Sequence, residues 1–397
     1  MTAALKNVRL GDILDIRDGT HDTPKYVEHG IPLITSKNLT DNGLCFRNIS
    51  YISEGDHKEI SKRSAVGRGD ILYGMIGTIG KPTLVETDIQ FSIKNVALFK
   101  LSNPEVDNRY FLYLLKSDEI NKQISQASKG GTQKFVSLGA LRDLKATLPS
   151  LPEQRRIAAI LDKANALRAK RREAIAKLDQ LLLSVFLEMF GDPVTNPKGW
   201  DIVTLSALSS EKMANGIFRK KEGYSDTGLP VVWIEELFRG HELDLSKSRK
   251  LQPTEKDLRT YGLLPGDILF CRSSLNLDGI AYNNIYLGES DRALFECHLI
   301  RLRVNQSLVD PVFLNYLLRN EGVRGQIKQR AKTSTMTTID QKGLNDVAVI
   351  LPSRELQAKF RSILESVALR TALMESCMLT GETLFKSLQH QVFSRNL

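Results

Sequence analysis

The chain contains two copies of one long segment, and this duplication constrains its fold more than any other sequence feature. LPSLPEQRRIAAIL at 148–161 matches LPSRELQAKFRSIL at 351–364, an offset of 203 residues. GDIL at 69–72 recurs at 266–269, an offset of 197 residues. Because a repeat of about 200 residues is much longer than the roughly 20–50 residues of solenoid repeats, each copy must be a whole domain followed by a trailing helix.

Both copies show the same order of expected elements. Short apolar runs, such as IPLITSKNLT and GDILYGMIGTIGKPTLVE, are separated by Gly, Pro, Asn and Asp, which predicts β-strands joined by turns. A helix is expected around 107–127 in the first copy and around 310–330 in the second. An extended Leu-Pro segment and then a long helix follow in each. The pattern predicts an α+β chain with two similar α/β domains.

The long helix of the first copy is expected from 153 to 190, where Gly191-Asp192-Pro193 ends it. A helix of this length extends for ~57 Å. Its apolar residues recur every three or four positions and form one stripe, which Arg168 and Arg171 interrupt. The second long helix repeats the stripe, with a weak point at Gly381.

The two copied stripes are most simply buried by packing the long helices on one another. Antiparallel packing would form a coiled-coil spacer and relate the halves by a pseudo-twofold axis, with the globular domains at opposite ends. The alternative is that each helix docks on a partner protein. The expected organisation is a domain at 1–150, a helix at 151–191, a domain at 192–350 and a helix at 351–397.

Charge and composition narrow the class of protein. The net charge of +9 favours an acidic partner, with nucleic acid first. No run approaches the ~18 apolar residues of a membrane span, and the first residues lack an apolar signal core, so we expect a cytoplasmic protein with no membrane contact. The four cysteines are scattered and the six histidines form no paired pattern, so no metal site is expected.

Catalytic motifs are missing from the sequence. It contains no G-x-x-x-x-G-K-[ST] phosphate loop, and Asn196-Pro197 is followed by Lys198 rather than by the second proline of an adenine methyltransferase. D-x-K triplets such as Asp56-His57-Lys58 and Asp143-Leu144-Lys145 match a nuclease pattern, but such triplets are common by chance. We therefore expect no catalytic centre in this chain.

The order of these segments resembles the specificity subunits of type I restriction–modification systems. LPEQRRIAAILDK and FGDPVTNPKGW carry the resemblance, which covers the whole chain. It implies that the domains at 1–150 and 192–350 are target recognition domains, each reading one half of a bipartite, asymmetric site in double-stranded DNA. The helices at 151–191 and 351–397 would then set the gap between the half-sites. The second helix keeps little of the family's E-Q-R-R-I motif, so the resemblance says less about its packing and its partner contacts.

The resemblance also implies partners. The subunit would recruit two DNA methyltransferase subunits. Two ATP-dependent restriction subunits can join the resulting complex. No cofactor is then expected on this chain, because S-adenosylmethionine, ATP and Mg belong to the partner subunits.

The loop after each GDIL segment is the first candidate for DNA contact. Glycines allow a close approach of the backbone to a phosphate, and Lys81 or Arg272 supplies positive charge. An ordinary β-turn with solvated ends is the alternative. The candidate residues are Tyr73, Thr78 and Lys81 in the first copy, and Arg272, Ser273, Ser274 and Asn276 in the second.

Three further regions are candidates for DNA contact. The loop after the internal helix carries small residues, lysines and hydroxyls, which suit DNA contact and an ordinary solvated loop equally; its candidates are Lys129, Thr132, Lys134, Lys332 and Thr335. The second region holds Lys37 and Asn38, just after a strand, and its counterpart Trp233 is expected in the core. The basic residues Arg219 and Lys220 could contact phosphate or lie on a solvated turn.

Two rival hypotheses remain at this stage. One is a scaffold without DNA, in which two globular domains on a coiled coil bridge protein partners. The other is an unusual enzyme whose hydrolytic residues come together from both units. Salt-sensitive DNA binding distinguishes DNA recognition from the scaffold.

Overall fold

The computed structural model describes residues 6–41, 43–128, 135–333 and 336–394. The chain divides into two compact units, one formed by 1–173 with 376–397 and the other by 174–375. Each unit therefore holds one globular domain and about half of each long helix. None of the described helices has the length and apolar composition needed to cross a membrane.

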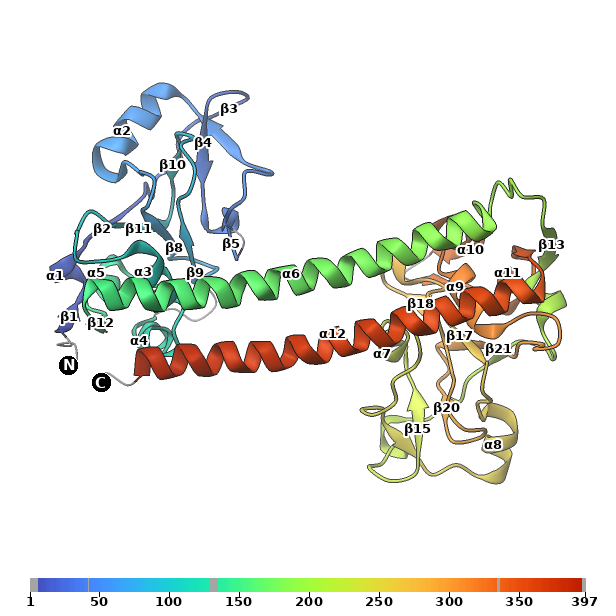
Figure 1. The fold of residues 1–397 in the computed structure, drawn as a ribbon. Coiled ribbons are helices and arrows are strands. Elements are labelled where there is room, and N and C mark those ends of the chain that lie inside the picture. The colour runs from blue at the N-terminus through green and yellow to red at the C-terminus, as the bar shows by residue number, and fades with distance from the viewer. Residues whose placement is uncertain (1–5, 42, 129–134, 334–335, 395–397) are drawn as a thin grey trace. The chain divides into compact units, whose positions relative to one another are not determined.

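Two four-stranded sheets build the first domain (Figure 1). One has antiparallel neighbours throughout and is composed of β2 (Asp15–Asp18), β11 (Val96–Lys100), β8 (Ile71–Gly74) and β9 (Gly80–Leu84). The other contains one parallel pair, β10 with β4, and is composed of β10 (Ser92–Ile93), β4 (Ile31–Ile34), β7 (Ser50–Ile52) and β3 (Tyr26–Val27). Two shorter pairs complete it, β1 (Lys6–Arg9) with β12 (Lys145–Leu148) and β5 (Leu39–Thr40) with β6 (Gly43–Leu44).

The helices of the first domain begin at polar caps. Ser53, Asp107, Ser117 and Ser137 each accept a backbone N–H bond at the start of a helix, which satisfies donors that the helix itself leaves unpaired. The helical elements are α1 (Leu10–Ile13), η1 (Ser36–Asn38), α2 (Glu54–Ser64), α3 (Asn108–Leu115), α4 (Asp118–Ala127) and α5 (Leu138–Arg142).

The second domain repeats this topology. Its main sheet follows the order β14 (Ala214–Asn215), β21 (Leu299–Leu302), β17 (Ile268–Cys271) and β19 (Asn283–Ile285). A second sheet holds β16 (Lys250–Leu251), β15 (Leu229–Val232) and β20 (Leu294–Phe295), again with one parallel pair. A third holds β18 (Ser273–Ser274), β23 (Thr337–Thr338) and β22 (Lys332–Thr333), and β13 (Asp201–Thr204) pairs with β24 (Ala348–Leu351).

The second domain has eight described helical elements, and all except η3 and η4 have a counterpart among the six described in the first domain. They are η2 (Leu205–Leu208), η3 (Lys221–Gly223), α7 (Ile234–Leu237), α8 (Glu255–Tyr261), η4 (Leu277–Gly279), α9 (Pro311–Leu318), α10 (Glu321–Arg330) and α11 (Gln341–Asn345). The duplication read from the sequence is therefore a duplication of fold.

One expectation about local structure was wrong. The helix expected around 107–127 is two helices, α3 and α4, and the helix expected around 310–330 is likewise α9 and α10. The break has a local cause, because Ser117 and Asn320 cap the second helix of each pair through their side chains.

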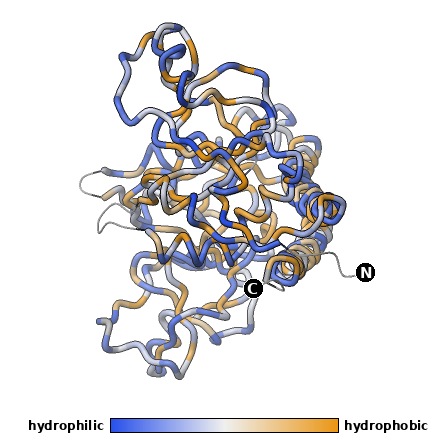
Figure 2. The backbone as a smooth tube through the Cα atoms, turned by 90° about the vertical axis from the view of Figure 1, so that its left-hand side faces the viewer, coloured by the Kyte–Doolittle hydropathy of each residue, from blue (hydrophilic) through white to orange (hydrophobic). Residues whose placement is uncertain are grey.

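Two long helices, α6 (Leu151–Phe190) and α12 (Arg354–Ser394), run through both units. In the first unit, Arg168 donates to Glu382 and Arg171 donates to the Cys377 carbonyl. The contacted residue of α12 therefore moves toward lower residue numbers as α6 advances. The two helices are therefore antiparallel there. In the second unit, Phe186 packs against Phe360 with ring centroids 5.5 Å apart. Hydrophobic and hydrophilic residues are interspersed along the backbone (Figure 2).

Arg168 interrupts the predicted apolar stripe for a structural reason. Its Nε donates to Glu382 Oε1 at 2.8 Å, and its guanidinium lies 4.5 Å from the centre of the Phe385 ring. Arg172 also pairs with Glu382, at 2.9 Å. The charged position is thus an ion pair between the helices combined with a cation–π contact.

A buried glutamine attaches each long helix to its domain. Gln154 accepts a hydrogen bond from the Asp107 N–H at 2.9 Å and donates to the Pro149 and Glu105 carbonyls, each at 2.9 Å. Gln357, the equivalent residue, accepts from the Asp310 N–H at 2.7 Å and donates to the Pro352 carbonyl at 2.7 Å.

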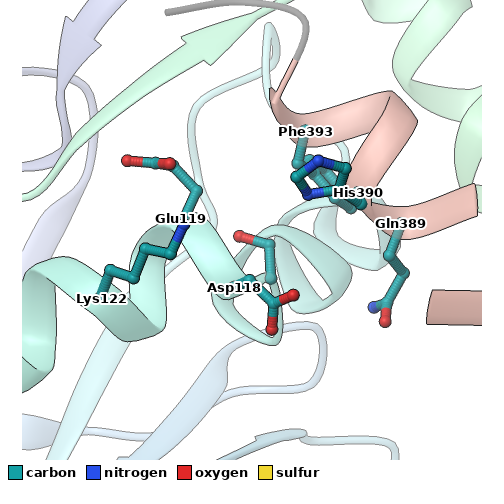
Figure 3. A pocket seen from close by; sticks show the side chains of 7 residues that line it. Asp118, Glu119, Lys122, Gln389, His390 and Phe393 are labelled. Carbon is teal, nitrogen blue, oxygen red and sulfur yellow. The ribbon is translucent and has the colours of Figure 1, made fainter. Parts of the chain in front are cut away.

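The last turns of α12 pack on the first domain beside α4. The Phe393 ring lies 5.5 Å from that of Tyr110, and a pocket of about 30 Å³ remains between the helices (Figure 3). This volume admits about one water molecule. Asp118 and Glu119 line the pocket together with His390, so its charge does not suit a nucleic acid.

Candidate nucleic-acid interface

The candidate loops of the first domain meet at one place. Ser36 Oγ donates to the Ile76 carbonyl at 3.3 Å, which joins the loop after β4 to the loop after β8. The Val136 N–H donates to the Met75 carbonyl at 3.0 Å, and Ile76 forms a β-bridge with Phe135. The segment that follows the internal helices therefore reaches the same edge.

A cleft of about 510 Å³ lies where these loops meet. The exposed Lys37 and Thr78 line it together with Lys94 and Asn95, which are half-buried. Among the described residues that line the cleft there is no carboxylate. The full lining is Tyr26, Leu33, Thr35, Ser36, Lys37, Asn38, Asn48, Ser50, Ile76, Gly77, Thr78, Lys94 and Asn95. The cleft thus offers positive charge, amides and hydroxyls, which are the groups that contact phosphates and base edges.

A chain of hydrogen bonds orients Asn95 at the cleft. Its Oδ1 lies 2.9 Å from His21 Nδ1, and His21 Nε2 lies 2.8 Å from the buried Asp18 carboxylate, which also pairs with Arg63. The hydrogen bonds from Asn95 and Asp18 raise the pKa of His21, because both acceptors favour the protonated ring. With its oxygen held by His21, Asn95 keeps its NH₂ group available at the cleft.

Two candidates in the first domain have structural roles. Asn38 is buried: its Oδ1 accepts from the Thr35 N–H at 3.0 Å, and its Nδ2 donates to the Cys45 carbonyl at 3.0 Å. Tyr73 is 1% exposed in the core, and burial raises its pKa to about 12. Neither side chain offers a free group to a ligand, because long-range packing covers both. The sequence alone does not show this packing.

Lys81 lies at the start of β9, exposed and with a left-handed backbone conformation (φ 51°), and it is not among the residues lining the cleft. Lys94 and Asn95 were missed by the sequence analysis. The only local signal was their place directly after the short β10 strand. Lys129, Thr132, Lys134 and Thr335 lie outside the described residues.

The second domain brings its candidate loops together by strand pairing. In the three-stranded sheet, Ser273 and Lys332 both lie opposite Thr338. The Ile339 N–H donates to the Arg272 carbonyl at 2.9 Å, which extends the pairing. Arg272 and Lys332 are exposed, whereas Ser273 is buried.

The remaining candidates of the second domain make local contacts. Asn276 is exposed and caps η4 by accepting from the Asp278 N–H at 3.1 Å, and Ser274 Oγ accepts from the Asn276 N–H at 3.1 Å. Arg219 donates to both oxygens of the Asp257 carboxylate at 2.9 and 3.0 Å, so its charge is already paired. Lys220, beside it, is exposed.

Trp233 is half-buried rather than in the core. Its ring lies 5.2 Å from that of Tyr224, and the Arg249 guanidinium lies 4.3 Å from its centre. Its indole N–H has no partner among the described residues. Aromatic rings interleaved with arginine are common where proteins contact nucleic acids, and no shared sequence motif marks this group.

The two domains differ at equivalent positions. Lys94 follows β10 and forms a parallel bridge with Thr20, and Glu296 follows β20 and forms the same bridge with Ile217. A lysine in one domain therefore corresponds to a glutamate in the other. Lys94 is half-buried and Glu296 is buried, so this difference alters the interior beside the loops rather than the exposed charge.

Comparison with known proteins shows which proteins the chain resembles. Residues 4–177 match the family model described as the type I restriction modification DNA specificity domain. The putative type I restriction enzyme MjaX specificity subunit of Methanocaldococcus jannaschii is 23% identical over 385 residues, which cover 90% of this chain and 85% of that protein. The type I restriction enzyme StySPI specificity subunit of Salmonella potsdam is 21% identical over 383 residues, which cover 92% and 81%.

Solved structures share the fold. The S subunit of a type I restriction–modification system from M. genitalium has a TM-score of 0.56 at 16% identity, covering 98% of this chain and 96% of its own. A chain from a structure of complex assembly and conformational transition of the type I R-M system has a TM-score of 0.62 at 18% identity, covering 98% of both chains. With its duplicated domain and paired long helices, the chain is similar to the specificity subunits of type I restriction–modification systems.

Proposed function

We propose that this chain reads a bipartite DNA sequence, with one recognition domain for each half-site and no catalytic centre of its own. The observation that carries the proposal is the convergence of the candidate loops at one edge in both domains. In the first domain they surround a basic cleft, and in the second they form the edge that carries Arg272 and Lys332.

The chemistry of the cleft supports DNA as its ligand. Lys37 and Lys94 can neutralise phosphates, and the oriented Asn95 amide can donate to base acceptors. The second domain carries the exposed Glu235 where the first carries the exposed Lys37, each two residues after the helix N-cap, so we expect two unlike half-sites. A bipartite target must therefore be asymmetric.

The absence of catalysis is also part of this proposal. Asp56 of one D-x-K triplet accepts a hydrogen bond from Ser53 at the start of α2, and Asp143 of another pairs with Arg9 at 2.6 Å. Both carboxylates thus serve local structure.

Partner subunits would supply the chemistry. The long helices expose leucines in both units, which suits docking of another protein; the most exposed are Leu167, Leu369, Leu373, Leu379 and Leu384. Two methyltransferase subunits would dock on the chain, and restriction subunits can join this complex. S-adenosylmethionine, ATP and Mg would bind to those partners rather than to this chain.

Joining two readers also explains the affinity that short half-sites need. Once one domain has bound its half-site, the other domain meets its own half-site at high effective concentration, provided that the linker between the domains matches the separation on the DNA. We propose that α6 and α12 supply this match.

A genome-wide adenine-methylation map with and without the gene tests the function. We expect a split motif of two unlike halves that disappears on deletion. The paired variant Lys37→Ala/Asn95→Ala should relax one half of the motif, and Arg272→Ala/Lys332→Ala should relax the other. Lys122→Ala, an exposed lysine on α4 outside the cleft, is the charge-matched control.

The opposite result would favour the scaffold. If the purified chain with its methyltransferase binds DNA with no dependence on salt or sequence, and cleft variants behave as wild type, then DNA reading is refuted. The exposed leucines would then mark a protein that only bridges partners.

A further inference from the structure

Glu296, Cys297 and His298 form a compact cluster in the turn between β20 and β21 of the second domain. One ligand atom from each residue lies within 4.8 Å of the other two. Cys297 Sγ lies 3.6 Å from His298 Nδ1, and His298 Nδ1 lies 2.8 Å from Glu296 Oε2. A thiol, an imidazole and a carboxylate thus face one another.

The carboxylate of Glu296 is incompletely satisfied. The residue is 2% exposed, and its Oε2 accepts from the His298 N–H at 2.9 Å. Its Oε1 is the only carboxylate oxygen among the described buried side-chain atoms that lacks a hydrogen-bond partner. Leaving such an oxygen buried without a partner is costly, and a cation at this point would remove the cost.

The separation of sulfur and nitrogen matches a tetrahedral metal. With Zn–S at ~2.3 Å and Zn–N at ~2.0–2.1 Å, two ligands at the tetrahedral angle are ~3.6 Å apart. Thiolate and imidazole together select zinc over magnesium or calcium, which prefer oxygen ligands.

We propose that Glu296, Cys297 and His298 bind one Zn²⁺, with solvent at the fourth position. On binding, the cation replaces the thiol proton of Cys297 and any proton on His298 Nδ1, and both protons pass to solvent. Glu296 keeps its hydrogen bond to the His298 N–H and directs its carboxylate to the metal. No electron transfer is involved.

Among the residues that the structure describes, only the second domain holds such a cluster. At the equivalent turn of the first domain, Lys94 and Asn95 follow β10, and His21 makes its contacts with Asp18 and Asn95 instead. We therefore expect one zinc ion per chain.

The metal would order a surface that carries a candidate DNA contact. The Arg272 N–H donates to the His298 carbonyl at 2.8 Å, and Arg272 Nη1 donates to the Cys297 carbonyl at 3.3 Å. A zinc ion that fixes this turn also fixes the guanidinium beside it. This consequence rests on the proposed function, whereas metal binding itself does not.

The test is zinc titration of the purified, reduced full chain against a chromophoric chelator, without DNA. We expect one equivalent to bind, and we expect Cys297→Ser and His298→Gln each to weaken binding at least tenfold. Cys45→Ser and Cys377→Ser are matched controls and should bind as wild type. Cobalt should give a thiolate charge-transfer absorption that Cys297→Ser abolishes.

Two results would overturn the site. One is wild-type zinc affinity no higher than that of Cys297→Ser, with both proteins folded by circular dichroism. The other is loss of binding in a control variant. Because the titration contains no DNA, failure of the zinc site and failure of the proposed DNA reading give separate results.

Discussion

Gln154 attaches the start of α6 to the first domain, and replacing it by leucine should destabilise that unit. The side chain is 1% exposed and makes three hydrogen bonds, to the Asp107 N–H and to the Pro149 and Glu105 carbonyls. Leucine has a similar volume but no polar atoms, so these three groups lose their partner. At ~1 kcal/mol for each bond, we expect a loss of about 3 kcal/mol in the free energy of unfolding.

Hydrogen exchange with urea denaturation measures this effect and locates it. The Asp107 amide hydrogen should exchange faster in Gln154→Leu, and the urea concentration at the unfolding midpoint of the first unit should fall. Gln357→Leu should act on the Asp310 amide in the second unit, because it makes the equivalent contacts. Gln180→Leu, at an exposed position of α6, should change stability by less than ~0.5 kcal/mol.

The reasoning fails if Gln154→Leu unfolds within ~0.5 kcal/mol of wild type, or if protection of the Asp107 amide does not change. Either result would mean that the buried glutamine is not what holds the helix to the domain.

Four further predictions concern the helices and the cleft. Glu382→Gln removes the anionic partner of Arg168 and Arg172, so the melting temperature should fall. Because these ion pairs lower the pKa of Glu382, the stability advantage of wild type over the variant should disappear as pH falls through that pKa. If wild type and variant lose stability equally toward low pH, the prediction is wrong. His21 has a raised pKa, so its contribution to stability is complete below its unfolded pKa and is lost as pH rises through the folded value; His21→Gln should flatten this dependence in thermal scans. Lys37→Ala removes one phosphate contact and should lower the slope of log affinity against log salt by ~0.9, whereas an unchanged slope would place Lys37 away from DNA. Deleting one heptad from each long helix shortens it by ~10.5 Å and should change the tolerated gap by about 3 base pairs without altering the half-sites, as read from the methylation motif.

The sequence by itself determined the features that depend on repetition and on near neighbours. The 203-residue offset predicted two copies of one domain, and the three- and four-residue spacing predicted the helices that are observed as α6 and α12. Such features are readable because a helix is built from contacts within a few residues along the chain. Even here, the break between α3 and α4 was missed, since it depends on the cap at Ser117.

Only the tertiary structure decided which residues meet. Asn38 is next to Lys37 and Tyr73 is five residues before Thr78 in the sequence, yet Asn38 and Tyr73 are buried whereas Lys37 and Thr78 are exposed at a cleft. Asn95 became a candidate through His21, a residue 74 positions away. These outcomes follow from strand pairing and packing between distant segments, and no local pattern carries that information. Residue types were visible from the start, but their roles depend on the partners that the fold brings to them.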